Sequence, residues 1–132
     1  MAIFDKINVK PSASNETTTI ASGAKIDGVF NCDSRLHVDG EIVGDIYSKS
    51  VVIIGKSGKI NGKIIANRLV VNGVFEGNAD CDIIEILTGG KFIGKVITKE
   101  LIIEEKARFE GESKMKEDHN APKMITEIFP KP

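Results

Sequence analysis

Residues 36–46 read LHVDGEIVGDI, a stretch in which every second residue is aliphatic or glycine. Within it, residues 41–44 are one copy of a short phrase that closes on glycine and recurs along most of the chain. Successive glycines of this phrase lie 15 to 18 residues apart. Self-similarity at a nearly fixed period is the signature of a repeat architecture. The six glycines are Gly28, Gly44, Gly62, Gly77, Gly94 and Gly111.

Aligning the six copies on this glycine gives columns of shared chemistry. The residue two places before the glycine is always large and apolar, and the residue four places before it is always glycine or alanine. Two further, largely apolar columns precede each phrase and lie two residues apart, as side chains on one face of a strand do. Helical spacing is not sustained in the repeat region. The pattern predicts an all-β, single-domain β-solenoid of about six coils of ~17 residues.

The segments around and within the repeats differ in character. Residues 1–16 and 117–132 lack the period, so we expect flexible arms on either side of a solenoid domain at 17–116. Inside the domain, the bends at 55–58 and 87–90 are longer than those at 39–40 and 72–73. This alternation predicts a superperiod of two coils.

Composition narrows the class of protein. Of the 132 residues, 41% are hydrophobic but only 5% are aromatic, so the core must consist mainly of Ile, Val and Leu. A net charge of −1 argues against a nucleic-acid partner, which requires a basic face. No apolar run approaches the ~20 residues of a membrane span, and the N-terminus does not resemble a secretory signal. Two distant cysteines without CxxC spacing indicate a reducing, cytoplasmic location.

The residues that usually carry chemistry do not converge. His37 is predicted to point outward from a strand, and His119 lies in the C-terminal arm. Cys32 and Cys81 fall in the same inward column as small residues, so we expect them to fill the core. No phosphate-binding loop and no calcium-binding nonapeptide repeat is present in the sequence. We therefore expect no enzyme activity, no cofactor and no metal site.

A hexapeptide-repeat acyltransferase is the enzymatic alternative. Such enzymes are also solenoids, but they place an aliphatic residue at every sixth position. Only Ile54-Gly55 resembles that motif here, and intervals of 15 to 18 residues break the sixfold register. These enzymes also need a catalytic histidine between subunits, for which His37 is a poor candidate. A CoA-dependent thermal shift would reveal this class.

The ends of the predicted solenoid have no visible cap. The last coil resembles an interior coil, and neither end is flanked by an amphipathic helix. Uncapped coils expose unpaired backbone groups and apolar side chains, which are templates for pairing with another chain. We expect self-association end to end. The predicted polymerisation interface is Ile20, Ile26 and Phe30 at one end, and Leu101, Ile103 and Phe109 at the other.

The glycine phrases, the pattern of residues 36–46 and the two arms together resemble a bactofilin, over about residues 17–116. The specificity of this resemblance comes from six coils in register on a short chain. It implies a right-handed parallel β-helix that polymerises without nucleotide into nonpolar filaments. It also implies a bacterial cytoskeletal scaffold that positions cell-wall enzymes, or membrane-anchored shape proteins, and influences cell shape.

Bactofilins often carry a short apolar membrane-targeting sequence at the N-terminus. Met1, Ile3 and Phe4 are the candidates here, either for peripheral contact with the inner face of the cytoplasmic membrane or for docking a partner. The competing hypothesis for the whole chain is a monomeric or small-oligomer solenoid that acts as a binding module. Sequence periodicity alone decides neither the handedness of the solenoid nor the polarity of a filament.

Overall fold

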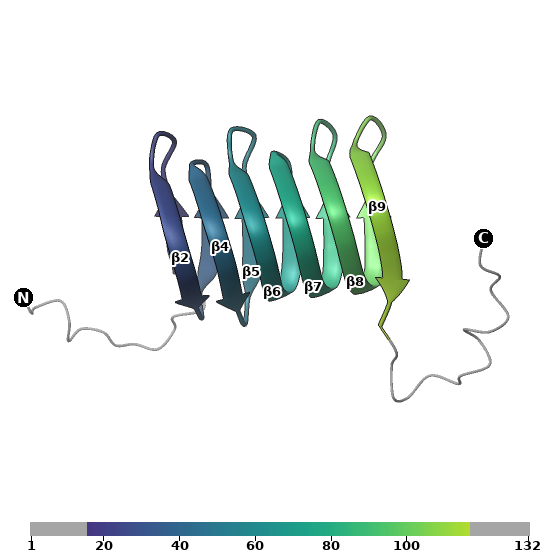
Figure 1. Ribbon diagram of the computed structural model, residues 1–132, viewed down its shortest axis with the longest axis horizontal. Coiled ribbons are helices and arrows are strands. Elements are labelled where there is room, and N and C mark those ends of the chain that lie inside the picture. Colours follow the sequence, from purple (N-terminus) through teal and green to yellow (C-terminus); the bar gives the residue numbers. More distant parts are fainter. Residues whose placement is uncertain (1–15, 117–132) are drawn as a thin grey trace, which may run out of the picture.

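The computed structural model describes residues 16–116 of the 132-residue chain, and these residues form a parallel β-solenoid. Each strand pairs in parallel with its counterpart one coil further along, and the coils stack in a row (Figure 1). The predicted all-β solenoid of about six coils is confirmed. The strands are β1 (Thr17–Ile20), β2 (Lys25–Cys32), β3 (Arg35–Val38), β4 (Glu41–Ser48), β5 (Val51–Ile54), β6 (Lys59–Val71), β7 (Val74–Ile86), β8 (Lys91–Ile103) and β9 (Arg108–Met115).

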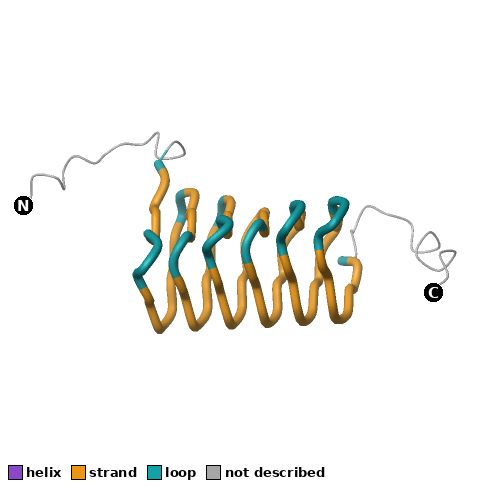
Figure 2. The backbone as a smooth tube through the Cα atoms, turned by 90° about the horizontal axis from the view of Figure 1, so that it is seen from above, coloured by secondary structure: helices purple, strands orange, loops and turns teal. Residues whose placement is uncertain are grey.

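Every coil has two segments, and the view from above in Figure 2 shows that the strand bends sharply within the second of them. A first segment of four residues, such as β3, leads through a turn into a second segment of eight residues, such as β4. A corner then connects the second segment to the first segment of the next coil. In the 13-residue strands β6, β7 and β8, the strand continues through the corner, with pairing on both sides of it, so one strand contains both segments. The first segments thus form one face of the rod, and the bent second segments form the rest of its outline.

The unequal repeat intervals arise because the corner and the turn of a coil vary in length independently of each other. The corner has two residues at 33–34 and 49–50, but one residue at 67, 82 and 99. The turn has either two or four residues. The shortest interval, 15 residues, combines the short corner with the short turn, and every other interval adds a corner residue, a longer turn or both. Because the extra residues lie at bends, every segment keeps its register.

The recurring glycine is required by both conformation and space. All six glycines have φ between +136° and +146°, a region that residues with a Cβ rarely adopt. A Cβ on any of the last five would also overlap the carbonyl oxygen of the glycine one coil before and lie 2.7–2.9 Å from its carbonyl carbon. The backbones of adjacent coils therefore approach each other at this position as no other residue type would permit.

The predicted superperiod of two coils is correct for the first five coils and wrong for the last. Four-residue turns close at residues 21–24, 55–58 and 87–90 and alternate with two-residue turns at 39–40 and 72–73. The sixth coil should then have a short turn, but it has a long one at 104–107, and two tall loops stand side by side in Figure 1. Thr88 supports this stacking, because its hydroxyl donates to the Glu105 carbonyl at 2.9 Å and its N–H donates to Glu104 at the same distance.

The turn of the last coil contains Lys106 at φ +69°, the one non-glycine residue with positive φ within residues 16–116. Gly23 and Gly89 hold the same turn position with φ near +90°. Glycine would relieve the strain of the left-handed conformation, and this gain outweighs the entropy that glycine adds to the unfolded chain. We therefore expect Lys106→Gly to stabilise the fold by about 0.5–1 kcal/mol in urea unfolding. Ser57 holds the equivalent position without positive φ, so Ser57→Gly is the matched control and is expected to destabilise. Equal effects of the two substitutions would contradict this interpretation.

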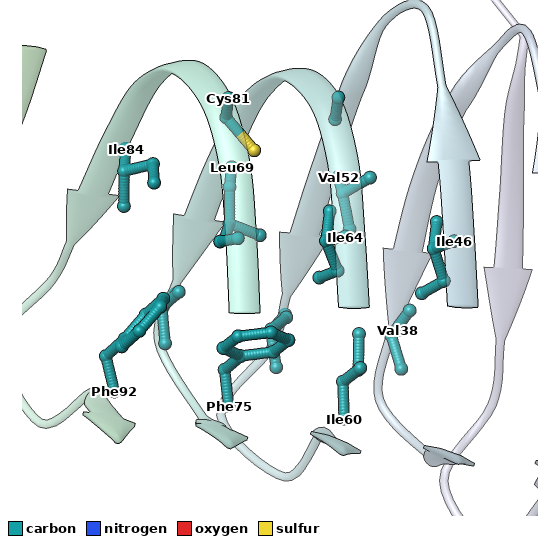
Figure 3. Packing of buried hydrophobic residues seen from close by; sticks show 14 of the residues in the cluster. Val38, Ile46, Val52, Ile60, Ile64, Leu69, Phe75, Cys81, Ile84 and Phe92 are labelled. Carbon is teal, nitrogen blue, oxygen red and sulfur yellow. The ribbon is translucent and has the colours of Figure 1, made fainter. Parts of the chain in front are cut away.

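The core consists of ladders of inward side chains. Ile42, Ile60 and Phe75 succeed one another in register, and all are fully buried. The ring of Phe92 lies 4.8 Å from that of Phe75 and 5.5 Å from that of Phe109, measured between centroids. Figure 3 shows Ile60, Phe75 and Phe92 of this ladder among the side chains that fill the interior of the rod. Each ladder confirms an inward column that the period of two predicted.

Candidate functional site: the uncovered ends of the solenoid

The C-terminal end presents a core cross-section that no described residue covers. Ile103 is 45% exposed and Met115 is 64% exposed, although both continue inward ladders. One coil earlier, Ile86 is fully buried and Thr98 is 3% exposed. Strand β9 pairs with β8 on one side and with no described strand on its other side. This end therefore has the shape and chemistry of a surface that a seventh coil would cover.

The other two C-terminal residues predicted for the interface are partly covered. Leu101 and Phe109 are half-buried against the core cluster. Beside them the inward ladder that contains Val96 ends at the exposed Ser113. An open depression of about 550 Å³ lies beside this position. Its lining residues are Lys95, Val96, Ile97, Glu112, Ser113 and Lys114.

At the N-terminal end, the large apolar side chains that point inward are less exposed than Ile103 and Met115. Ile26 and Phe30 are half-buried, as expected for residues of an end coil. The expectation that Ile20 is exposed is wrong, because only 8% of its surface is accessible. Ile20 pairs in register with Val38, and one of its methyl carbons lies 3.3 Å from where a Cβ on Gly40 would stand. The glycine in the turn at 39–40 therefore leaves room for Ile20 to pack into the core.

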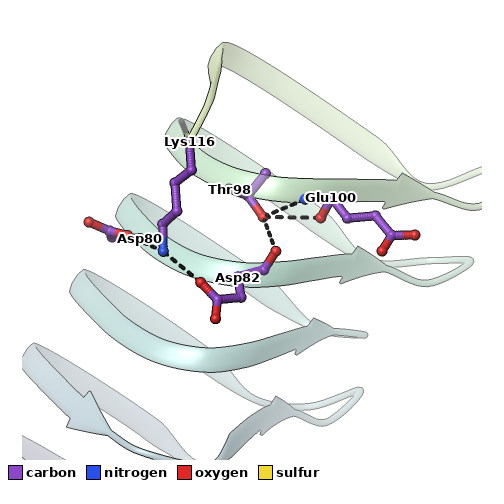
Figure 4. Close-up of polar contacts among 5 residues, drawn as sticks. All are labelled: Asp80, Asp82, Thr98, Glu100 and Lys116. Atoms are coloured by element: carbon purple, nitrogen blue, oxygen red, sulfur yellow. Dashed lines mark hydrogen bonds and ion pairs between the residues drawn. The ribbon is translucent and has the colours of Figure 1, made fainter. Parts of the chain in front are cut away.

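Lys116, which the sequence analysis did not single out, holds the chain at the C-terminal corner. Its Nζ lies 3.0 Å from a carboxylate oxygen of Asp80 and 2.9 Å from one of Asp82 (Figure 4). Burial disfavours the charged amine, but the hydrogen bonds to Asp82 and Asp80 outweigh it and raise the pKa of Lys116. The hydrogen bond from Lys116 likewise lowers the pKa of Asp82. Because these groups are partly exposed, the contribution to stability is at most about 1 kcal/mol.

The repeat gives the position of Lys116 in its coil, but not its partners two coils away. Lys116 follows the last second segment, so it occupies the corner position that Lys99 and Asp82 hold in the two preceding coils. Its backbone N–H donates to the Thr98 carbonyl at 2.9 Å, which continues the ladder by one more residue. The side chain then runs back along the corner rather than across the end, so it leaves Ile103 uncovered.

The remaining candidate residues sit where a structural role explains them. Cys81 is fully buried, and burial raises the pKa of its thiol to about 12, so it is no nucleophile at neutral pH. Cys32 is half-buried in the same column and donates weakly to the Ser34 carbonyl at 3.4 Å. His37 points outward, as predicted, and lies 3.2 Å from Asp39. His119 and the docking candidates Met1, Ile3 and Phe4 lie outside the described residues.

Metal-binding clusters and membrane-spanning helices are both absent from the described part of the chain. Within residues 16–116, no group of three or more His, Cys, Asp or Glu side chains is arranged to hold a metal ion. Over the same residues, no helix has the length and apolar character to cross a membrane.

Comparison with known proteins agrees with this geometry. A search of curated proteins gave no match. A solved structure, a cryo-EM reconstruction of Thermus thermophilus bactofilin double helical filaments, matches with a TM-score of 0.72 at 18% sequence identity, covering 75% of this chain and 99% of that chain. The model of the bactofilin family, described as polymer-forming cytoskeletal, matches residues 18–114. This chain belongs to the bactofilin family, and it is a polymer-forming cytoskeletal protein.

Proposed function

We propose that this protein polymerises end to end, without nucleotide, into a scaffold filament. The observation that carries the proposal is the uncovered core at the C-terminal end, where Ile103 and Met115 are exposed on ladders that are buried one coil earlier. Covering an aliphatic or aromatic side chain contributes roughly 1.5–3 kcal/mol. Burial of apolar surface supplies this energy in every subunit contact, so the assembly requires no nucleotide.

The proposed interface comprises the six end-coil residues of the sequence analysis. Leu101, Ile103 and Phe109 form the C-terminal contact, and Met115 joins them because of its exposure. Ile26 and Phe30 form the N-terminal contact, with the buried Ile20 supporting them from below. The bactofilin resemblance implies that like ends meet, which gives a nonpolar filament. The Thermus thermophilus bactofilin forms double helical filaments, and we extend a two-stranded filament to this chain.

The biological role follows from the family resemblance. In this proposal the filament lies in the cytoplasm at the inner face of the membrane, and it positions cell-wall-modifying enzymes or membrane-anchored shape proteins. Met1, Ile3 and Phe4 are the proposed membrane or partner contact. A single short apolar segment binds a membrane weakly, but a filament presents many copies, and multivalency converts weak contacts into stable attachment.

Electron microscopy of the purified full-length protein in nucleotide-free buffer tests the polymer. We expect filaments whose subunits repeat every ~29 Å along the axis, since six coils stack at the ~4.8 Å spacing of strands. Like-end contacts would double the true repeat to ~58 Å, because successive subunits then alternate in direction. Monodisperse particles at every concentration tested would instead support the single-copy binding module.

A further inference from the structure

The outer edge of the last first segment, Glu100–Ile103, is open. The preceding coil pairs with these residues on one side, and no described strand pairs with them on the other. In a parallel ladder, the N–H and C=O groups of one residue face the same neighbour. The Ile86 carbonyl accepts from the Glu104 N–H at 2.9 Å, so the backbone groups of Ile103, which holds the same position one coil later, face the open side. The same is true of Leu101, two residues earlier.

Two inward side chains end at this edge as well. Ile103 is 45% exposed and Leu101 is partly exposed, whereas Ile86, one coil earlier, is fully buried. Unpaired backbone groups beside an apolar surface favour the addition of a strand. A strand that fits here needs the pattern of a first segment, with apolar residues or threonine at its second and fourth positions.

The sequence contains such a segment beyond the described residues. Residues 125–129, here named the arm segment, read ITEIF, and residues 83–87 read IIEIL. Three of the five residues are identical, and Thr126 holds the second position, where the first coil has Thr18. Residues 83–86 are the strand that already pairs with Glu100–Ile103. A strand of nearly the same sequence is therefore available for each side of Glu100–Ile103.

We infer that the arm segment pairs in parallel with Glu100–Ile103 and forms a partial seventh coil. Thr126 covers Leu101 and Ile128 covers Ile103, in the register that the preceding coil has on the other side. The cover is intramolecular, and it closes the first-segment side of the C-terminal end.

Backbone hydrogen bonds complete this pairing. The N–H groups of Leu101 and Ile103 face the open side and donate to carbonyls of the arm segment. In return, the N–H groups of Glu127 and Phe129 donate to the carbonyls of the edge. Pro130 follows directly, and because it has no N–H, it prevents a further strand from extending the new edge.

The chain between Lys116 and the arm segment serves as a loop in this pairing. Its direct continuation into the ladder would bury Asp118 and Asn120 in the two inward columns, which is unfavourable for polar side chains without partners. Residues 117–124 instead leave the corner and return to it. Closing a loop of eight residues costs little more entropy than closing a shorter one.

The cover and the proposed polymer compete for Ile103. The loop keeps the arm segment at an effective concentration in the millimolar range, so dilute subunits are mostly covered. A partner subunit also covers Phe109 and Met115, which the arm segment leaves open, so the partner displaces the arm segment at high concentration. The cover therefore sets a concentration threshold for assembly, and this consequence rests on the proposed function, whereas the contact itself does not.

The test compares two substitutions in the arm segment that differ in the face they change. Ile128→Lys alters the side chain that covers Ile103, whereas Ile125→Lys alters an outward side chain beside Glu100 and is the matched control. Hydrogen exchange, resolved by NMR, reports the protection of the Leu101 and Ile103 amides. All proteins in this comparison are full-length and carry Met115→Arg, which keeps them from assembling, because Met115 is 64% exposed in the proposed polymer contact.

We expect Ile128→Lys to speed exchange of the Leu101 and Ile103 amides about tenfold, as for a cover present in about ten of eleven molecules. Ile125→Lys should leave their exchange unchanged. Equal exchange in the parent protein and in Ile128→Lys would overturn the cover, whether or not the protein forms filaments.

Sedimentation of the same variants without Met115→Arg measures the assembly threshold. The concentration at which Ile128→Lys begins to pellet should lie at least about tenfold below that of the unmodified protein and of Ile125→Lys. An unchanged threshold with faster exchange would overturn the competition and leave the cover. Failure of every protein to pellet would overturn the proposed polymer, and the exchange result would still decide the cover.

Discussion

Gly77→Ala is expected to abolish the folded solenoid. The added Cβ would overlap the carbonyl oxygen of Gly62 and lie 2.8 Å from its carbonyl carbon, both of which are backbone atoms held in the ladder between coils. Relief would require the two coils to separate, which breaks hydrogen bonds on both sides of the position. The positive φ of Gly77, +137°, adds strain to the steric conflict. We expect a loss of more than ~4 kcal/mol, seen as insoluble protein or as a lost β-sheet spectrum.

Gly89→Ala is the control for this prediction. Gly89 also has a positive φ, +90°, but nothing lies within 4 Å of the point in the turn that a Cβ would occupy. Its substitution carries the conformational penalty alone, about 1–2 kcal/mol. Urea unfolding followed by circular dichroism compares the two variants, in protein that also carries Ile103→Arg so that assembly adds no stability. If Gly77→Ala cost no more than Gly89→Ala, contact between coils would not be the reason for the glycine in the recurring phrase.

Ile103→Arg is expected to eliminate filaments while leaving the coils intact. Ile103 is 45% exposed in the single subunit, so the arginine extends into solvent without disturbing the core. In the filament, the same arginine would be buried without a partner, which costs several kcal/mol. A loss of about 3 kcal/mol per contact raises the concentration needed for assembly ~100-fold. High-speed sedimentation should therefore find the variant in the supernatant.

The mass of the soluble variant reports filament polarity. If like ends meet, the unchanged N-terminal ends still pair and analytical ultracentrifugation gives dimers. Head-to-tail assembly would leave monomers, because every contact then uses a blocked end. Phe109→Arg should behave similarly, at some cost in stability, since Phe109 stacks on Phe92. Glu110→Arg, an outward substitution on the same strand, should still pellet, and pelleting of Ile103→Arg would contradict the end-to-end contact.

The ladders are predictable from the sequence because strand alternation and coil register are both strictly periodic. Side chains such as Leu36 and Val52 fall in one inward column of the repeat, and they pair in register in the structure. The corners are less predictable, because an interval of 15 to 18 residues does not say where the extra residues lie. Only the pairing on both sides of residues 67, 82 and 99 distinguishes a one-residue corner from a longer turn.

The candidate site is predictable in location and less so in detail. Periodicity identifies the end coils, but exposure depends on how each turn closes, and this is why Ile20 is buried where an exposed residue was expected. Lys116 escapes prediction because its partners Asp80 and Asp82 lie two coils away, whereas the period relates each coil to its immediate neighbour.

The division of each coil into rigid segments and variable bends has a consequence for how such chains change over evolutionary time. An insertion or deletion at residues 33–34, 49–50 or 87–90 alters the outline of one coil, but every segment beyond it keeps its place. A change of one residue within a segment would instead exchange inside and outside for all side chains that follow up to the next bend. Small length changes are thus absorbed locally, whereas the reach of a subunit along its axis grows only in whole steps of ~4.8 Å, one coil at a time. The number of coils therefore sets the length of the subunit, and the bends allow its outline to vary.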